Sequence, residues 1–326
     1  MNKKEKWLEF LRAVPSVDLH CDILSSIKNG TKLLEKRSEG HWDLPRIKEG
    51  GLWAEVLSLF VHPKWYSGDD QWKAVVKFIS RLNNALQLSD ELSLVTTPEM
   101  LVKNAKDGKR SIILEIEGLH PIEEKPNLFD ELWKLGIRIY TLTWNNSNRF
   151  ATSCMNEADD GLKIDGRALI KEITNRKGII DLSHSSDKTF YDVLDMGVSP
   201  ILSHSAVKEL KKSSRNIDSK MIFSLSEAKG VIGVNFFPGF LSTKSYSEVD
   251  SYVLVDHIEH IINFGSIELP ALGSDFDGIK ALPKDIPDAS GFWIIAESLS
   301  NKGFDNNSIS GIMGKNFLNY WRRIQK

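Results

Sequence analysis

Apolar and polar positions along the chain follow two alternating patterns, one typical of buried strands and one typical of amphipathic helices. Short apolar runs predict eight strands, at residues 16–22, 52–61, 109–117, 137–143, 178–183, 200–203, 231–237 and 269–274. Apolar residues at helical spacing predict helices after most of them, at residues 69–86, 97–105, 127–135, 167–174, 186–196, 224–229 and 252–264. A helix is also expected at residues 3–13, two helices end the chain, the last at 308–323, and residues 41–51 are expected to be a polar connector.

Strands that alternate with helices pair in parallel, because each helix carries the chain back across the sheet. Eight such units predict an α/β fold, a closed (β/α)8 TIM barrel. We expect one domain over residues 1–326, with a short N-terminal helix and C-terminal helices, since no linker rich in Pro, Gly or Ser divides the chain. A doubly wound open sheet is the alternative, but no Gly-x-Gly-x-x-Gly motif follows any predicted strand.

The composition argues against several classes of protein. A hydrophobic fraction of 41% with 26% charged residues is typical of a soluble globular protein. A net charge of -2 argues against a nucleic-acid partner, which calls for a basic face. The charged N-terminus does not resemble a secretion signal, and no apolar run is long enough to span a membrane. Two cysteines, Cys21 and Cys154, suit a reducing compartment, so we expect a cytoplasmic protein.

Side chains that can bind a metal recur where the predicted strands end. They are His20, Asp22, Glu117, His184, His204 and Asp275. Each alone has a structural explanation, such as a helix cap, a turn or an ion pair. In a barrel, however, the carboxyl ends of all strands meet at the face that carries active sites. Three histidines with two or three carboxylates match a divalent metal site, and imidazole favours zinc.

The number of candidate ligands predicts two metal ions rather than one. A catalytic zinc ion takes three protein ligands and a water, so five ligands suffice for two ions if Glu117 bridges them. A water between two zinc ions is deprotonated near neutral pH and becomes a nucleophile. Since the chain has no Gly-x-Ser-x-Gly motif, water rather than a side chain is the expected attacker.

A series of short motifs runs in one order over nearly the whole chain. They are His20-Cys21-Asp22, Asp43-Leu44-Pro45 before Gly50-Gly51, Glu117-Gly118-Leu119-His120, Leu142-Thr143-Trp144-Asn145, Asp181-Leu182-Ser183-His184, Ser203-His204-Ser205, Arg215-Asn216, Gly273-Ser274-Asp275-Phe276-Asp277-Gly278 and Gly314-Lys315-Asn316-Phe317. In these motifs the sequence resembles the membrane (renal) dipeptidase family of zinc peptidases, as a soluble bacterial-type member. The resemblance implies a barrel of the metal-dependent hydrolase type that cleaves L-L and L-D dipeptides.

The resemblance also implies the role of individual residues. By motif position it implies two zinc sites that share one carboxylate, with His20, Asp22 and Glu117 at one and Glu117, His184 and His204 at the other. Arg215 is implied to bind the substrate carboxylate, for which its guanidinium is well shaped. Asp275 is implied to pass a proton from the attacking water to the leaving amine. A homodimer is expected from the resemblance alone.

Two positions depart from the family pattern. Trp144 stands where the animal enzymes of the family have a catalytic histidine that steadies the oxyanion, and an indole N–H cannot carry charge. Asn145 or His120 is a candidate substitute for that donor. Phe237 stands where a tyrosine is expected to help hold the substrate carboxylate, which leaves Arg215 as the main anchor.

Two other functions stay open beside a zinc dipeptidase with a small dipeptide substrate. The same binuclear barrel can hydrolyse other amides or lactones or carry out deamination, because fold does not fix function. A catalytically weak or silent metal-binding or partner-binding relative is the second alternative. The complete ligand set argues against it, since buried carboxylates are costly to keep without a metal.

Overall fold

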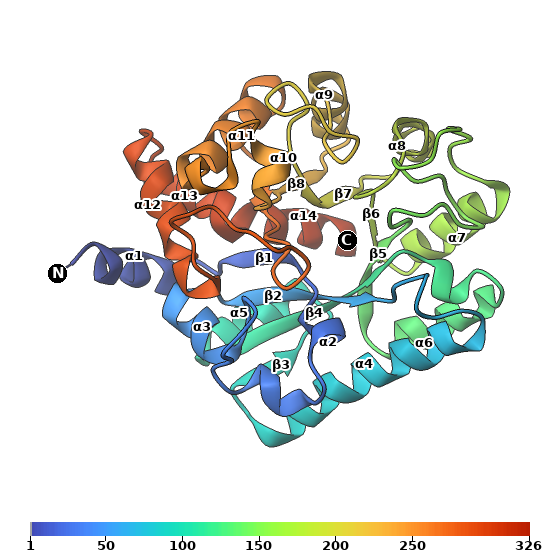
Figure 1. The fold of residues 1–326 in the computed structure, drawn as a ribbon, viewed down its shortest axis with the longest axis horizontal. Coiled ribbons are helices and arrows are strands. Elements are labelled where there is room, and N and C mark those ends of the chain that lie inside the picture. Colours follow the sequence, from blue (N-terminus) through green and yellow to red (C-terminus); the bar gives the residue numbers. More distant parts are fainter. Residues whose placement is uncertain (1) are drawn as a thin grey trace.

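Eight parallel strands close into a barrel with helices around it in the computed structural model, which describes residues 2–326 (Figure 1). The strands are β1 (Val17–Cys21), β2 (Ala54–Phe60), β4 (Arg110–Glu117), β5 (Ile137–Thr141), β6 (Ile179–Asp181), β7 (Ile201–Ser205), β8 (Val231–Val234) and β9 (Pro270–Leu272). Their order is β2-β1-β9-β8-β7-β6-β5-β4, and a β2–β4 pairing closes the ring. The predicted (β/α)8 TIM barrel is therefore confirmed.

Helices connect the strands and cover the outside of the barrel (Figure 1). They are α1 (Lys3–Arg12), α2 (Ile23–Ser26), α3 (Leu44–Gly50), α4 (Asp69–Leu88), α5 (Pro98–Lys106), α6 (Phe129–Lys134), α7 (Ile164–Asn175), α8 (Asp187–Leu194), α9 (Ser219–Glu227), α10 (Pro238–Leu241), α11 (Ser251–Phe264), α12 (Trp293–Asn301), α13 (Asn306–Ser310) and α14 (Asn316–Gln325). Most lie within a few residues of the predicted helices. Within residues 2–326, none of them has both the length and the apolar character that a membrane crossing requires.

Besides the short helices α2 and α10, which were not expected, four features differ from the expected elements. A short strand, β3 (Leu92–Leu94), pairs with the first residues of β4. It lies along the same edge of β4 that pairs with β5 nearer the carboxyl end. The expected connector contains α3, whose N-cap Asp43 accepts a hydrogen bond from the Arg46 N–H. Helix α9 begins five residues before its predicted start, because the side chain of Asp218 caps it. The expected last helix is broken at Gly314, where φ is 172° and ψ is -29°.

The barrel interior is apolar at the end where the strands begin. Inward-facing strand residues, such as Ile113 in β4, form one buried cluster with four side chains of α14: Phe317, Leu318, Tyr320 and Trp321. Ile113 lies four residues before Glu117 and so faces the same side of the strand. Helix α14 thus closes one end of the barrel, and the polar side chains gather at the other.

The segment after β9 is tied to the α2–α3 connection by a buried ion pair. Both carboxylate oxygens of Asp277 lie 3.1 Å from an Arg37 guanidinium nitrogen, and the Trp42 N–H donates to the same carboxylate. The exposed fractions of the two charged side chains are 13% for Arg37 and 3% for Asp277. Removing one partner of such a pair leaves the other charge buried without compensation.

We therefore expect Asp277→Asn to lower the free energy of unfolding by about 2–3 kcal/mol, because a charged acceptor of several hydrogen bonds is lost. Asparagine is chosen because Asp277 has a φ of 61°, a left-handed conformation that asparagine tolerates. Asp70→Asn is the matched control. Its pair with Lys73 is exposed, so it should cost less than about 1 kcal/mol. Urea unfolding of both variants measures the difference, and equal losses would contradict the assignment.

Candidate active site

The residues with candidate chemistry all lie at the carboxyl ends of barrel strands. Glu117 is the last residue of β4, while His20 and His204 lie near the ends of β1 and β7. His184 lies three residues after the end of β6, and Asp275 lies three residues after the end of β9. Because all pairings in the barrel are parallel, these ends form one rim. The expected convergence of the ligand residues is therefore present.

Bulges shift the two strand histidines relative to their neighbours. Between Asp18 and Cys21, β1 advances three residues while β2 advances two, and His20 lies inside this shift. The same change of register occurs in β7 between Leu202 and Ser205, around His204. A bulge re-aims a side chain next to an active site.

Two site residues adopt left-handed backbone conformations, which are costly for most residues other than glycine, asparagine and aspartate. The φ angle is 65° at His184, where it costs roughly 1–2 kcal/mol, and 63° at Asp275. Hydrogen bonds help to hold both side chains. Asn145 Oδ1 lies 2.8 Å from His184 Nδ1, and the side-chain amide of Asn235 donates to Asp275 Oδ2 at 2.9 Å. Such strain is typical of functional sites.

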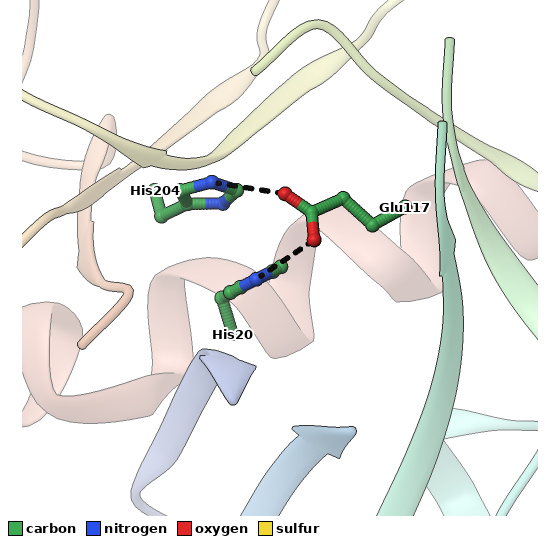
Figure 2. Close-up of side chains that lie close together, drawn as sticks. All are labelled: His20, Glu117 and His204. Atoms are coloured by element: carbon green, nitrogen blue, oxygen red, sulfur yellow. Dashed lines mark ion pairs between the residues drawn. The ribbon is translucent and has the colours of Figure 1, made fainter. Parts of the chain in front are cut away.

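The carboxylate of Glu117 lies at the centre of the cluster and turns its two oxygens in different directions (Figure 2). Its Oε2 is 3.7 Å from His20 Nε2. Its Oε1 is 3.1 Å from His184 Nε2 and 3.7 Å from His204 Nε2. Asp22 Oδ2 lies 3.4 Å from His20 Nε2 on the first side. The two oxygens of Glu117 thus have different nearest donors, although ligand atoms of His20, Glu117 and His204 also lie within 4.8 Å of one another.

Hydrogen bonds to the far side of each imidazole fix which nitrogen faces the cluster. His20 Nδ1 is 2.8 Å from Glu115 Oε2, an acceptor, so the imidazole donates there. His184 Nδ1 donates to the amide oxygen of Asn145 in the same way. The Ser203 hydroxyl donates to Asp181 and therefore accepts from His204 Nδ1. All three Nε2 atoms consequently face the space beside Glu117, and each presents a lone pair there when its imidazole is neutral.

These residues fit a divalent metal. Donors around a tetrahedral zinc ion with bonds of about 2.1 Å lie about 3.4 Å apart, close to the distances found here. The Nε2 atoms of His184 and His204 are 3.0 Å apart, and two lone pairs at that distance need a cation or a proton between them. Among residues 2–326, His20 Nε2 and Asp22 Oδ1 are buried without a hydrogen-bond partner. A metal ion beside these two atoms would supply the missing partner.

Burial shifts the pKa values of the cluster in different directions. It raises the pKa of Glu117 well above 4.5, and neighbouring carboxylates add to the effect. It opposes protonation of His20, but nearby carboxylates, led by Glu115, outweigh it and raise the pKa of His20 well above 6.5. It lowers the pKa of His184 and His204 well below 6.5. The raised pKa values favour proton binding at Glu117 and His20, whereas the lowered values disfavour it at His184 and His204.

A cavity of about 630 Å³ opens over the cluster, within the range of sites for small ligands. The residues expected to contact substrate, Arg215, Trp144, Asn145 and Phe237, all line it. The side-chain oxygen of Asn145 already accepts a hydrogen bond from His184 Nδ1. His120 does not line this cavity, and its Nε2 lies 2.6 Å from the carbonyl oxygen of Val61. It is therefore not placed to replace the missing histidine.

Several site residues were missed in the sequence. Glu115, which supports His20, precedes Glu117 by two residues and so faces the same side of β4, a signal present in Glu-Ile-Glu. The partner of Asp275, Asn235, has no such periodic signal. His62 and Trp65 also line the cavity, but they lie in a loop that carries no recognisable motif.

A model of the membrane dipeptidase family, peptidase family M19, matches residues 4–326. Dipeptidase tcpJ of Claviceps purpurea is 27% identical over 300 residues, 88% of this chain and 70% of that protein. An uncharacterized dipeptidase of Schizosaccharomyces pombe is 28% identical over 351 residues, 99% of this chain and 83% of that protein.

Solved structures share the fold. Dipeptidase AC, a metallopeptidase of family M19, superposes with a TM-score of 0.89 at 23% identity, covering 95% of this chain and 98% of that one. A metallopeptidase from Rhodobacter sphaeroides, liganded with a phosphinate mimic of L-Ala-D-Ala, gives a TM-score of 0.87 at 23% identity, covering 95% and 99% of the two chains.

The support that Glu115 gives to His20 can be tested by metal binding. We expect Glu115→Gln to lower zinc affinity by about 10- to 100-fold, because the neutral amide orients the imidazole without making it more basic. Competition with a chromophoric chelator measures the affinity. Glu124→Gln, a change at an exposed glutamate, is the control and should leave it unchanged. Equal affinities for the two variants would contradict the role of Glu115.

Metal binding should also release protons, because a metal ligand must be deprotonated and the pKa values of Glu117 and His20 are raised. We expect the calorimetric enthalpy of zinc binding to depend on the ionisation enthalpy of the buffer. Apparent affinity should fall as pH is lowered from about 7 to 5, since protons then compete better for both groups. The same enthalpy in phosphate and Tris buffers would rule this out.

Proposed function

Because the chain belongs to the membrane dipeptidase family, peptidase family M19, we propose that it is a zinc-dependent dipeptidase that hydrolyses L-L and L-D dipeptides with two metal ions. The observation that carries this proposal is the carboxylate of Glu117, whose two oxygens face separate imidazole groups. One carboxylate between two sets of donors is the arrangement that a pair of ions needs. Asp22 and His20 would hold one ion, and His184 and His204 the other.

Two divalent ions held by these residues would supply a water of lowered pKa as nucleophile and would polarise the substrate carbonyl. The remaining steps fall to side chains of the chain itself. Asp275 is suited to accept a proton and pass it to the leaving amine, because burial raises the pKa of its carboxyl to about 6. The hydrogen bond from Asn235 fixes the orientation of that carboxylate.

Arg215 is the proposed anchor for the substrate's free carboxylate. It is 7% exposed, one Nη donates to the His204 carbonyl oxygen at 3.0 Å, and its guanidinium lies 5.6 Å from the ring of Phe240. A guanidinium has five N–H donors, so several stay available to a carboxylate. Phe237, at 5.0 Å from Phe240, contributes an apolar surface without the hydroxyl of a tyrosine.

Recognition through the charged ends of the substrate would accept both L-L and L-D dipeptides. A guanidinium that binds the carboxylate places no direct demand on the configuration of the residue that bears it. The related metallopeptidase from Rhodobacter sphaeroides holds a mimic of L-Ala-D-Ala, which supports including the D-residue on the C-terminal side. A cytoplasmic location, a homodimer and a single domain stay predictions from the sequence.

The decisive experiment is hydrolysis of L-Ala-L-Ala and L-Ala-D-Ala by zinc-loaded protein. We expect cleavage of both, lost after chelation and restored by zinc. Glu117→Gln should lower kcat by about 100- to 1,000-fold or more, because a charged group at the reacting centre is removed. Glu124→Gln, at the surface, should leave kcat unchanged.

Failure to cleave either dipeptide, with two zinc ions verified by elemental analysis, would sink the proposal. Turnover of an N-acyl amino acid or a cyclic amide by the same preparation would then identify another hydrolase on this barrel. No turnover of any of these substrates would favour a metal-binding protein without catalysis.

A further inference from the structure

Four aromatic side chains form a continuous surface on one side of the active-site cavity. We call Phe60, His62, Trp65 and Trp144 the aromatic wall, and all four line the cavity. The rings of His62 and Trp65 are stacked, with centroids 4.3 Å apart and planes at 14°. The ring of Trp144 lies 5.3 Å from His62 and 4.8 Å from Phe60. It also lies 6.3 Å from the ring of His184, so the wall ends beside the metal ligands.

The outer end of the wall is exposed to solvent. Trp65 is 76% exposed, although its indole is among the largest apolar side chains. A single exposed tryptophan needs no explanation in itself. Here, however, it lies at a cavity, and His62 stacks on one of its faces while most of its surface stays free. An apolar group that enters the cavity can cover that surface.

The wall is preorganised for a ligand. His62 Nδ1 accepts a hydrogen bond from the Lys64 N–H at 3.2 Å, which fixes the imidazole between the two indoles. Tryptophan side chains have only two rotatable bonds, so little conformational entropy is lost when a ligand packs against them. Binding to such a surface gains more affinity than binding to a mobile one.

The wall is separate from the proposed carboxylate anchor. Within residues 2–326, the contacts of Arg215 include the His204 carbonyl and the ring of Phe240, and no wall residue is among them. A dipeptide whose carboxylate is held by Arg215 has its C-terminal residue next to Arg215 and the His204 backbone. Arg215 and the wall line the same cavity but are not in contact, so a dipeptide anchored at Arg215 can extend its N-terminal residue toward Trp144, which approaches the cluster at His184.

Building on the proposed function, we propose that the aromatic wall is the subsite for the side chain of the N-terminal residue and that it selects dipeptides with an aromatic residue there. Aromatic rings gain from offset stacking and edge contacts beyond the burial of their area. An alanine side chain reaches too little of the wall to gain the same contacts.

The test compares kcat/KM for Phe-Ala, Ala-Phe and Ala-Ala with zinc-loaded protein. We expect Phe-Ala to exceed Ala-Ala by about 10-fold, the ratio that one good aromatic contact provides. Trp65→Ala should bring this ratio close to 1, and Trp65→Phe should keep most of it. The control is Phe223→Ala, which removes an aromatic ring that is 58% exposed on α9 and should leave the ratio unchanged.

Each outcome separates the inference from the proposed function. Equal kcat/KM for Phe-Ala and Ala-Ala would leave the dipeptidase intact and overturn the subsite. A preference for Ala-Phe that Trp65→Ala abolishes would overturn its assignment to the N-terminal residue.

If no dipeptide is cleaved, the proposed function fails and binding decides the inference. Calorimetric titration of zinc-loaded Asp275→Asn protein, whose proposed metal ligands are intact, should then show Phe-Ala bound about 10-fold more tightly than Ala-Ala. Equal affinities would overturn the subsite as well.

Discussion

The buried carboxylate of Glu117 sets the main constraint on this molecule. Its residue is only 2% exposed, and its oxygens face the Nε2 atoms of His20 on one side and His184 and His204 on the other. A charge so far from water is stable only beside cations or donors. When they are neutral, the three imidazoles offer lone pairs instead, because their other nitrogens are held by acceptors. The carboxylate and the imidazoles are thus compatible with each other when a cation lies between them, and the strands must bring them to one rim.

The barrel could be predicted from the sequence because its signal is distributed over eight strands. Each strand is a run of apolar residues, and an error of two residues at one end does not change the topology. The missed elements are short or polar. Strand β3 has three residues, too few for any periodicity, and α3 contains Pro45 and charged residues, which leave few apolar positions to show helical spacing. Its signals were the N-cap Asp43 and the proline in the first turn.

The convergence of the candidate ligand residues could be predicted for a related reason, since strand ends are easy to place and all meet at one face. What surrounds them is set by tertiary contacts that a sequence does not reveal. Asp181 reaches the imidazole of His204 through the Ser203 hydroxyl, and Asn235 reaches Asp275 from the adjacent strand end. The bulges around His20 and His204 likewise depend on pairing with neighbouring strands.

Trp144 connects the proposed reaction with the proposed selectivity. Replacing a histidine by an indole removes a donor that can carry charge, and the loss of one oxyanion donor typically lowers turnover by about 100- to 1,000-fold. The same indole joins Phe60 and His62 into one surface that reaches within 6.3 Å of the His184 ring. Binding energy from a side chain remote from the scissile bond can hold the substrate in a reactive geometry. An enzyme with this wall would therefore exchange part of its electrostatic stabilisation for positioning, and it would lose most with small substrates that cannot reach the wall.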